Sequence, residues 1–124
     1  DQVVVGGNLL FGGSNGVTLD FGTTAGGSLV NWADTFWDSQ RSWVIFSVAA
    51  STSGAQNLAL SNLAYNDASG ASLSAARANA TFFISQAGSD LVLNYNAVPE
   101  PSTPALLMFG LAGLLGLRTL RRKA

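Results

Sequence analysis

The chain contains no cysteine and no histidine among its 124 residues. Their absence excludes disulfide scaffolds, zinc sites built from these side chains, thiol nucleophiles and acid–base catalysis by imidazole. Charged residues are also scarce, at 10% of the chain against about 25% in an ordinary soluble domain. With 48% hydrophobic residues, the chain is not of the disordered, highly charged class, and its length fits one small domain. We expect no metal site, no cofactor and no enzymatic activity.

The few charges are unevenly distributed along the chain. Residues 1–104 carry seven acidic and two basic side chains, a net charge of −5, whereas residues 105–124 carry four basic and no acidic ones. An acidic body lacks the basic face that neutralises phosphates, so we expect no nucleic-acid binding. The four basic residues at the end of the chain are Arg118, Arg121, Arg122 and Lys123.

Long apolar runs are absent except near the C-terminus, where residues 105–117 are thirteen residues without a charge. A helix of that length is about 20 Å long, short of the ~30 Å hydrocarbon core of a bilayer. The flanking residues lengthen the segment, and a basic side chain at its end can extend to the headgroups. We therefore expect a single transmembrane helix over residues 105–120, with a buried core helix as the alternative. The positive-inside rule then places the basic tail, residues 121–124, in the cytoplasm and the body across the membrane.

All three prolines lie in one stretch, residues 99–104. Proline fixes its own φ, lacks an N–H donor and restricts the preceding residue, so neither a helix nor a strand continues through this stretch. We interpret it as an exposed linker in which a protease can reach unpaired backbone. The linker begins with the sequence Pro99, Glu100, Pro101, Ser102 and Thr103.

The Pro-Glu-Pro stretch, the Leu/Gly-rich span 105–117 and the basic cluster 121–123 together resemble the PEP-CTERM sorting signal of bacterial surface proteins. The resemblance covers the last 26 residues and depends on the order of the three parts, because Pro-Glu-Pro alone is common. It implies recognition by exosortase, a membrane-embedded enzyme, and processing at or near residues 99–103.

The same resemblance implies a place in the bacterial cell envelope. The protein would be anchored in the inner membrane by its C-terminal helix during sorting, and would then lie at the cell surface or outside the cell. Exopolysaccharide is the further partner that the resemblance implies. Because the chain begins at Asp1 without methionine, we expect a signal peptide to be missing or already removed.

Residues 1–98 consist of short β-prone runs separated by clusters of Gly, Asn and Ser, which is typical of an all-β domain. The runs on either side of Gln86–Ser89 predict a hairpin. Residues 28–41 break this rhythm and predict one or two helical turns with Asn31 as the N-cap. A second short helix is expected within residues 72–79.

Two architectures fit this body. We favour the end of a right-handed parallel β-helix, and the alternative is a small antiparallel β-sandwich. The order of the runs is similar to that at the C-terminal end of autotransporter-like β-strand-repeat surface proteins. Apolar residues that alternate with polar ones, in runs that lie between turn clusters, are expected to face the core. The predicted core residues are Val17, Leu19, Phe21, Val44, Phe46, Leu58, Leu60, Phe82, Ile84, Leu91 and Leu93.

The body offers two kinds of candidate binding residue. Sugar rings stack on exposed aromatic side chains, so Trp37, and after it Trp32 and Trp43, are candidate carbohydrate contacts, although burial in the core is the competing interpretation. Asn79 begins the sequon Asn-Ala-Thr and is a candidate glycosylation site.

The sequence thus predicts an exported, non-catalytic cell-surface or biofilm-matrix protein that exosortase processes. Two alternatives stay open. One is an extracellular polysaccharide-binding module, and the other is a tail-anchored structural subunit that self-assembles through its helix.

Overall fold

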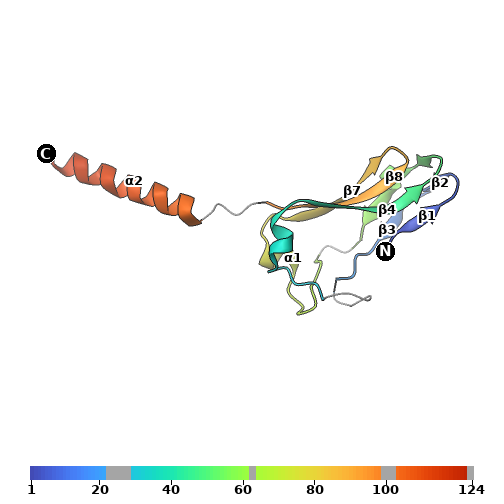
Figure 1. Ribbon diagram of the computed structural model, residues 1–124, viewed down its shortest axis with the longest axis horizontal. Coiled ribbons are helices and arrows are strands. Elements are labelled where there is room, and N and C mark those ends of the chain that lie inside the picture. The colour runs from blue at the N-terminus through green and yellow to red at the C-terminus, as the bar shows by residue number, and fades with distance from the viewer. Residues whose placement is uncertain (22–28, 62–63, 99–102, 123–124) are drawn as a thin grey trace.

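The computed structural model describes residues 1–21, 29–61, 64–98 and 103–122. The body is mostly β, and helix α2 (Thr103–Arg122) stands apart from it (Figure 1). The main sheet has four strands, and β1 runs parallel to β4 while the other neighbours are antiparallel. In spatial order its strands are β1 (Val3–Val5), β4 (Arg41–Val48), β8 (Asp90–Asn96) and β7 (Thr81–Ala87).

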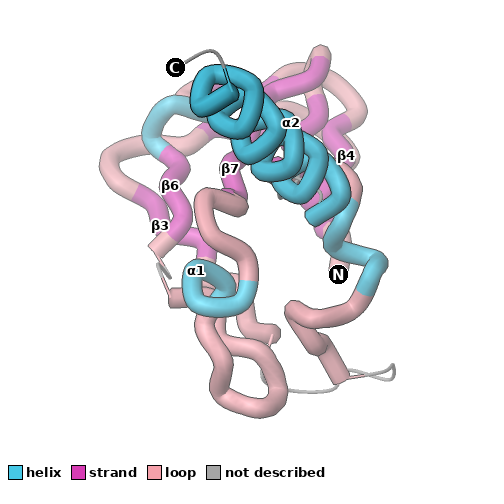
Figure 2. Tube along the Cα trace, turned by 90° about the vertical axis from the view of Figure 1, so that its left-hand side faces the viewer, coloured by secondary structure: helices cyan, strands magenta, loops and turns pink. Residues whose placement is uncertain are grey.

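Two further strand pairs continue the parallel contact of β1 with β4. They are β2 (Leu9–Leu10) with β5 (Thr52–Ser53), and β3 (Asn15–Val17) with β6 (Leu58–Leu60); Figure 2 shows β3 beside β6. All three pairs have one register, because Val3 pairs with Phe46, Leu9 with Thr52 and Asn15 with Leu58, each 43 residues further along the chain. Residues 3–17 therefore run alongside residues 46–60 without a slip in register.

The predicted parallel β-helix is wrong. Among the described strands, parallel pairing is limited to these two segments, because β4 has antiparallel β8 on its other side and β8 pairs in turn with antiparallel β7. In a β-helix each coil pairs in parallel with the next, whereas here β7 and β8 form an antiparallel hairpin on the other side of β4. The antiparallel sandwich does not describe the body either, since three of the described strand pairs are parallel.

The predicted transmembrane helix is also wrong. Within the described part of the chain, no helix is both long enough and apolar enough to cross a membrane. Helix α2 forms, but its uncharged run of thirteen residues is shorter than the ~20 apolar residues that a membrane span needs. The helix then continues into the basic residues Arg118, Arg121 and Arg122. The expected membrane anchor is therefore not supported, and the topological role predicted for the basic cluster stays a prediction.

The short helical elements lie close to their predicted places. The 3-10 turn η1 (Thr35–Asp38) falls within residues 28–41, but its N-cap is Asp34, whose carboxylate accepts a hydrogen bond from the Phe36 N–H at 2.7 Å. The predicted cap, Asn31, instead accepts one from the Ala33 N–H at 2.9 Å, in the preceding turn. Helix α1 (Leu73–Ala76) begins at the cap Ser72, and a second 3-10 turn, η2 (Ala55–Asn57), was not predicted.

The predicted hairpin is confirmed. Strands β7 and β8 pair from Thr81–Asn96 to Ala87–Asp90, which leaves a two-residue connection. Gly88, the first of the two, has a φ of +63°, and a positive φ at that position is what a type II′ turn requires. The turn and the strands on either side of it are local features, and the sequence signal for them is strong.

The core is a cluster of aromatic side chains on one face of the sheet. Its buried members are Trp32, Trp37, Tyr65, Leu73, Phe82, Leu93 and Tyr95, and Phe21 packs against them. Ring centroids of Phe21 and Trp32 are 4.9 Å apart, and those of Trp32 and Trp37 are 4.8 Å apart, both in edge-on geometry. Such pairs contribute roughly 0.5–1.5 kcal/mol each beyond the burial of their area.

Of the eleven predicted core residues, only Val44 is exposed, at 38%. The cause is a β-bulge in β4, where Val44 pairs with Val92 but Phe46 pairs with Leu91. The extra residue, Ile45, packs against the core. A bulge inserts one residue and reverses the alternation beyond it, so Val44 faces away from the side on which Phe46 lies.

We expect Gly54→Ala to destabilise the body by more than about 2 kcal/mol, because it combines two costs. Gly54 has a φ of +75°, and an added Cβ would lie 2.2 Å from the carbonyl oxygen of Phe11; a positive φ alone costs an ordinary residue roughly 1–2 kcal/mol. Gly70 has a φ of +83° but open space around an added Cβ, so Gly70→Ala is the matched control and should cost about 1 kcal/mol. Urea unfolding of both variants checks this, and equal losses would show that the contact with Phe11 is unimportant.

Candidate functional site

Trp32 is completely buried and ties distant parts of the body together. Its indole N–H donates to the carbonyl oxygen of Tyr65 at 2.8 Å, and its backbone N–H donates to the Asp67 carboxylate at 3.2 Å. The segment before β4 is therefore tied to residues 65–67, which follow β6 and lie more than thirty residues further along the chain.

Asp67 is a buried carboxylate, and both of its oxygens accept hydrogen bonds. One oxygen accepts from the Ser69 hydroxyl at 2.7 Å and from the backbone N–H groups of Ser69 and Ala71. Hydrogen bonding, above all from the Ser69 hydroxyl, lowers the pKa of Asp67 despite the opposing effect of its burial. A carboxylate held ionised by its neighbours organises this turn and is poorly suited to act as a general acid or base at neutral pH.

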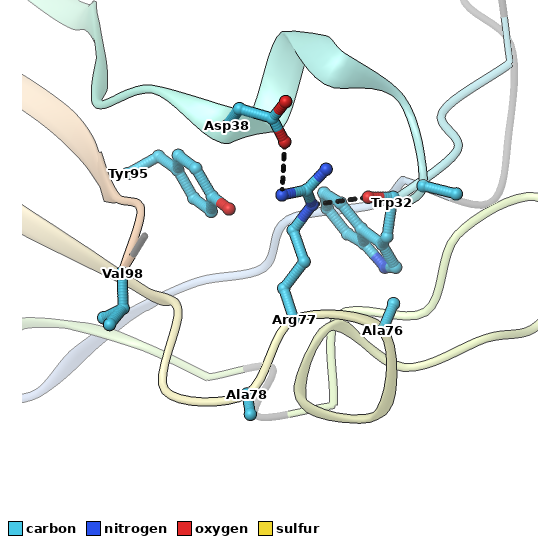
Figure 3. Close-up of a pocket in the computed structure, with 8 residues that line it drawn as sticks. Trp32, Asp38, Ala76, Arg77, Ala78, Tyr95 and Val98 are labelled. Atoms are coloured by element: carbon cyan, nitrogen blue, oxygen red, sulfur yellow. Dashed lines mark hydrogen bonds and ion pairs between the residues drawn. The ribbon is translucent and has the colours of Figure 1, made fainter. Parts of the chain in front are cut away.

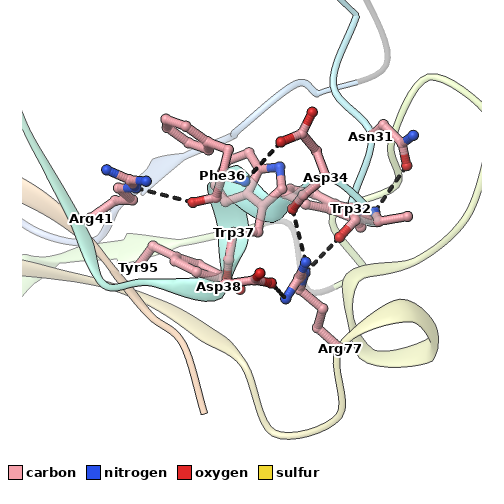
Figure 4. Close-up of polar contacts among 10 residues, drawn as sticks. Asn31, Trp32, Asp34, Phe36, Trp37, Asp38, Arg41, Arg77 and Tyr95 are labelled. Carbon is pink, nitrogen blue, oxygen red and sulfur yellow. Dashed lines mark hydrogen bonds and ion pairs between the residues drawn. The ribbon is translucent and has the colours of Figure 1, made fainter. Parts of the chain in front are cut away.

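Arg77, just after α1, also holds the segment before β4 (Figure 4). Its guanidinium donates to the carbonyl oxygens of Trp32 and Asp34, and forms an ion pair with Asp38 at 2.8 Å. The Arg77 side chain is 20% exposed, whereas that of Asp38 is 57% exposed. Each of its three nitrogens has an acceptor within the protein, so Arg77 acts as a clamp on residues 32–38.

A cavity of about 480 Å³ lies beside this clamp (Figure 3). Its wall includes Arg77, Asp38, Tyr95 and Val98, the last described residue before the proline-rich stretch. The Tyr95 hydroxyl donates to the Trp37 carbonyl oxygen at 3.0 Å, and burial raises the pKa of Tyr95. The polar side chains of Arg77, Asp38 and Tyr95 are thus already bonded to partners within the protein, and the described residues contain no cluster of three or more potential metal ligands.

The three tryptophans proposed as carbohydrate contacts lie in different environments. Trp32 and Trp37 are buried in the aromatic core, whereas Trp43 on β4 is 36% exposed. Trp43 has an exposed neighbour that the sequence analysis did not single out, Phe36, with ring centroids 6.5 Å apart and ring planes inclined by 31°. The Arg41 guanidinium lies 4.2 Å from the centre of the Phe36 ring, within the range of a cation–π contact.

Asn79 lies on the surface between α1 and β7. Its φ of +67° is in the left-handed region, which asparagine adopts more readily than most residues. Thr81, the third residue of the sequon, is exposed as the first residue of β7. The side chain proposed for glycosylation is therefore accessible.

The predicted sorting residues fall partly outside the described part of the chain. Pro99, Glu100, Pro101, Ser102 and Lys123 lie outside it, Thr103 is the first residue of α2, and Arg118, Arg121 and Arg122 belong to its last turns. The apolar side chains described on α2 are exposed, among them Met108 at 72% and Phe109 at 79%. The described side chains of α2 therefore add nothing to the core of the body.

Comparison with known proteins identifies this terminal segment. No curated protein and no solved structure matches the chain, and the autotransporter-like resemblance of the body is not shown. Residues 97–123 match the family model of the PEP-CTERM protein-sorting motif. The chain thus carries the sorting motif of proteins that are exported to the cell envelope or surface and processed by exosortase, a membrane enzyme.

Proposed function

We propose that the chain is a non-catalytic surface or matrix protein, and that its β body is the part that remains after exosortase has processed the motif. The observation that carries this proposal is the boundary between the two parts. The last strand, β8, ends at Asn96, and the matched motif begins at residue 97. Processing within the motif would therefore remove no strand and no buried residue of the aromatic core.

The absence of histidine and cysteine supports a body without catalysis. Its best-connected charged groups are used for structure, because Arg77 and Asp67 each hold several partners within the protein. Such a body would act through its surface rather than through a reactive centre. The proposed partner during export is the exosortase itself.

Glu100→Ala should slow processing about tenfold, which corresponds to roughly 1.4 kcal/mol of lost recognition. Glu100 is the only acidic residue after Asp90, so an enzyme that reads a negative charge between two prolines has no other carboxylate nearby. The measurement is the fraction of mature protein, resolved by mass, over time in a bacterial host that carries exosortase.

Asp1→Ala is the matched control, because it removes one exposed carboxylate at the opposite end of the chain. It should be processed at the parent rate. If Glu100→Ala is also processed at the parent rate, the motif does not act through its acidic residue and the proposed recognition fails.

A second candidate function is binding of an extracellular polysaccharide, and the exposed Phe36–Trp43 pair favours it. Two neighbouring exposed rings inclined by only 31° offer a platform for a sugar chain. Trp43 also lines a cavity of about 690 Å³ that includes the polar residues Thr18 and Asp20. Apolar lining with a few polar groups is typical of ligand sites of this size.

Trp43→Ala should abolish binding of the protein to its polysaccharide, whereas Phe83→Ala should bind the polysaccharide as the parent does. Phe83 is an exposed aromatic residue on a different strand, β7, and controls for general loss of apolar surface. Affinity electrophoresis in gels containing polysaccharides from the producing cells measures both variants. Equal retention of Trp43→Ala and the parent would contradict this candidate.

A further inference from the structure

Residues 3–17 form an edge whose outer side is open in the described part of the chain. Only every second residue of this edge uses its backbone groups to bond to the chain segment that contains β4, β5 and β6. The Val5 carbonyl oxygen accepts from the Ala49 N–H, and the N–H groups of Leu9 and Phe11 donate to the carbonyl oxygens of Ser51 and Ser53. In an extended strand the groups of the intervening residues point the other way. Val4, Leu10 and Gly16 therefore direct their backbone donors and acceptors outward, and no described strand lies on that side.

The strands of this edge are short, at three, two and three residues, but the edge lacks the side chains that commonly prevent strand pairing. Residues 2–18 contain no charged residue and no proline, the two devices by which native proteins commonly block their edge strands. Val4 is 76% exposed and Leu10 is 74% exposed, so the edge is also apolar. An uncharged edge with free hydrogen-bonding groups is a template for another extended segment.

The opposite edge of the main sheet, β7, is partly covered. The Gln86 side chain on β7 donates to the Thr52 carbonyl oxygen at 3.3 Å, and β7 contacts β6. The end of β7 is thus tied to the body, whereas no described strand pairs with the outer side of β1, β2 or β3.

We propose that a second copy of the chain covers this edge with its own residues 3–17, in antiparallel orientation across a two-fold axis near Leu10. Residues 3–17 carry no charge that a charged partner could recognise. A strand that pairs with them must therefore be uncharged and extended. Residues 3–17 of a second copy are both. Residues 1–104 carry a net charge of −5, which makes two copies repel each other over most faces. Residues 2–18 carry no charge, so two copies of this segment do not repel each other directly. Contacts of this kind, in which the same patch meets itself, are the commonest form of homodimer.

The absence of cysteine from the chain makes cross-linking a direct test. In an antiparallel pair, opposite Cα atoms lie about 4.5–5.5 Å apart, within the roughly 4.4–6.8 Å that a disulfide spans. Leu10→Cys in the full chain should therefore form a disulfide-linked dimer on mild oxidation. Val4→Cys, at an equally exposed position away from the axis, is the matched control and should not, because in this register residue 4 of one copy lies opposite residue 16 of the other and not opposite its own counterpart.

Sedimentation of the full chain without cysteine supplies the second measurement. The parent should show a monomer–dimer equilibrium, and Leu10→Lys should remain a monomer, because two lysines would meet at the axis. A parent that is monomeric at every concentration overturns the proposal. So does association that persists in Leu10→Lys, which would place the contact on α2 or another face, and so do oligomers that grow beyond two. Equal cross-linking of Leu10→Cys and Val4→Cys overturns the antiparallel register.

Discussion

Replacing Trp32 by alanine is expected to destabilise the body by about 3–5 kcal/mol, the range for truncating a buried aromatic side chain. Trp32 is fully buried, contacts Phe21 and Trp37 ring to ring, and donates its indole N–H to Tyr65. Small domains have a total stability of roughly 5–15 kcal/mol, so this one change removes a large part of it. The midpoint of thermal unfolding should fall by at least about 12 °C, given ~4–8 °C per kcal/mol for domains of this size.

Trp43→Ala is the matched control because Trp43 is 36% exposed. It should cost about 1 kcal/mol. Trp32→Phe should lie between the two, since it keeps a ring in the core and loses the hydrogen bond to Tyr65. Urea and thermal unfolding followed by circular dichroism rank the three variants, and a smaller loss for Trp32→Ala than for Trp43→Ala would contradict the assigned core.

Replacing Arg77 by methionine is expected to cost about 3 kcal/mol. Methionine keeps much of the aliphatic stem but removes the hydrogen bonds to the carbonyl oxygens of Trp32 and Asp34. A hydrogen bond to a charged group contributes about 1.5–3 kcal/mol, and the two act on one loop and are not additive. The ion pair with Asp38 adds little, because Asp38 is 57% exposed and exposed pairs contribute about 0–1 kcal/mol.

Arg41→Met is the control for the loss of an arginine. Arg41 donates one hydrogen bond to the Phe36 carbonyl oxygen and lies over the Phe36 ring, both at an exposed site, so its loss should cost less than about 1 kcal/mol. Asp38→Asn in the parent and in Arg77→Met completes a double-mutant cycle. A coupling energy above about 2 kcal/mol would show that the ion pair, rather than the two carbonyl contacts, is the main stabilising interaction of the clamp.

The parts of the fold that depend on neighbouring residues were predictable. Strand alternation and a Gly-containing turn predicted the β7–β8 hairpin, and the break in that rhythm predicted a helical turn before β4. The N-cap was misplaced by one turn, because Asn31 and Asp34 are both good caps and the choice between them depends on where the loop is held. Trp32 and Arg77 hold it through contacts with residues more than thirty positions away.

The pairing of distant strands was not predictable from local pattern. Gly- and Asn-rich breaks with short apolar runs occur in both parallel and antiparallel all-β folds, so the sequence did not show that β4 lies between a parallel and an antiparallel neighbour. The bulge at Ile45 likewise depends on how β4 meets β8, and it reversed the orientation predicted for Val44.

The candidate site was predictable in its terminal part and less so in the body. The order of proline-rich stretch, apolar span and basic cluster predicted the sorting motif that residues 97–123 match. In the body, a tryptophan in a short loop has the same sequence signature whether it is buried or exposed. Exposed Phe36 gave no signal of its own, although its position four residues after Trp32 and seven before Trp43 marks an aromatic-rich segment.

The most direct test of this account is the mass of the mature protein recovered from a host that carries exosortase. We predict a chain that retains β8 through Asn96 and has lost α2, together with an unprocessed chain in a matched host that lacks exosortase. A mature protein that still ends at Ala124, or one cut within the strands of the body, would contradict the proposed division into a displayed body and a removable sorting motif.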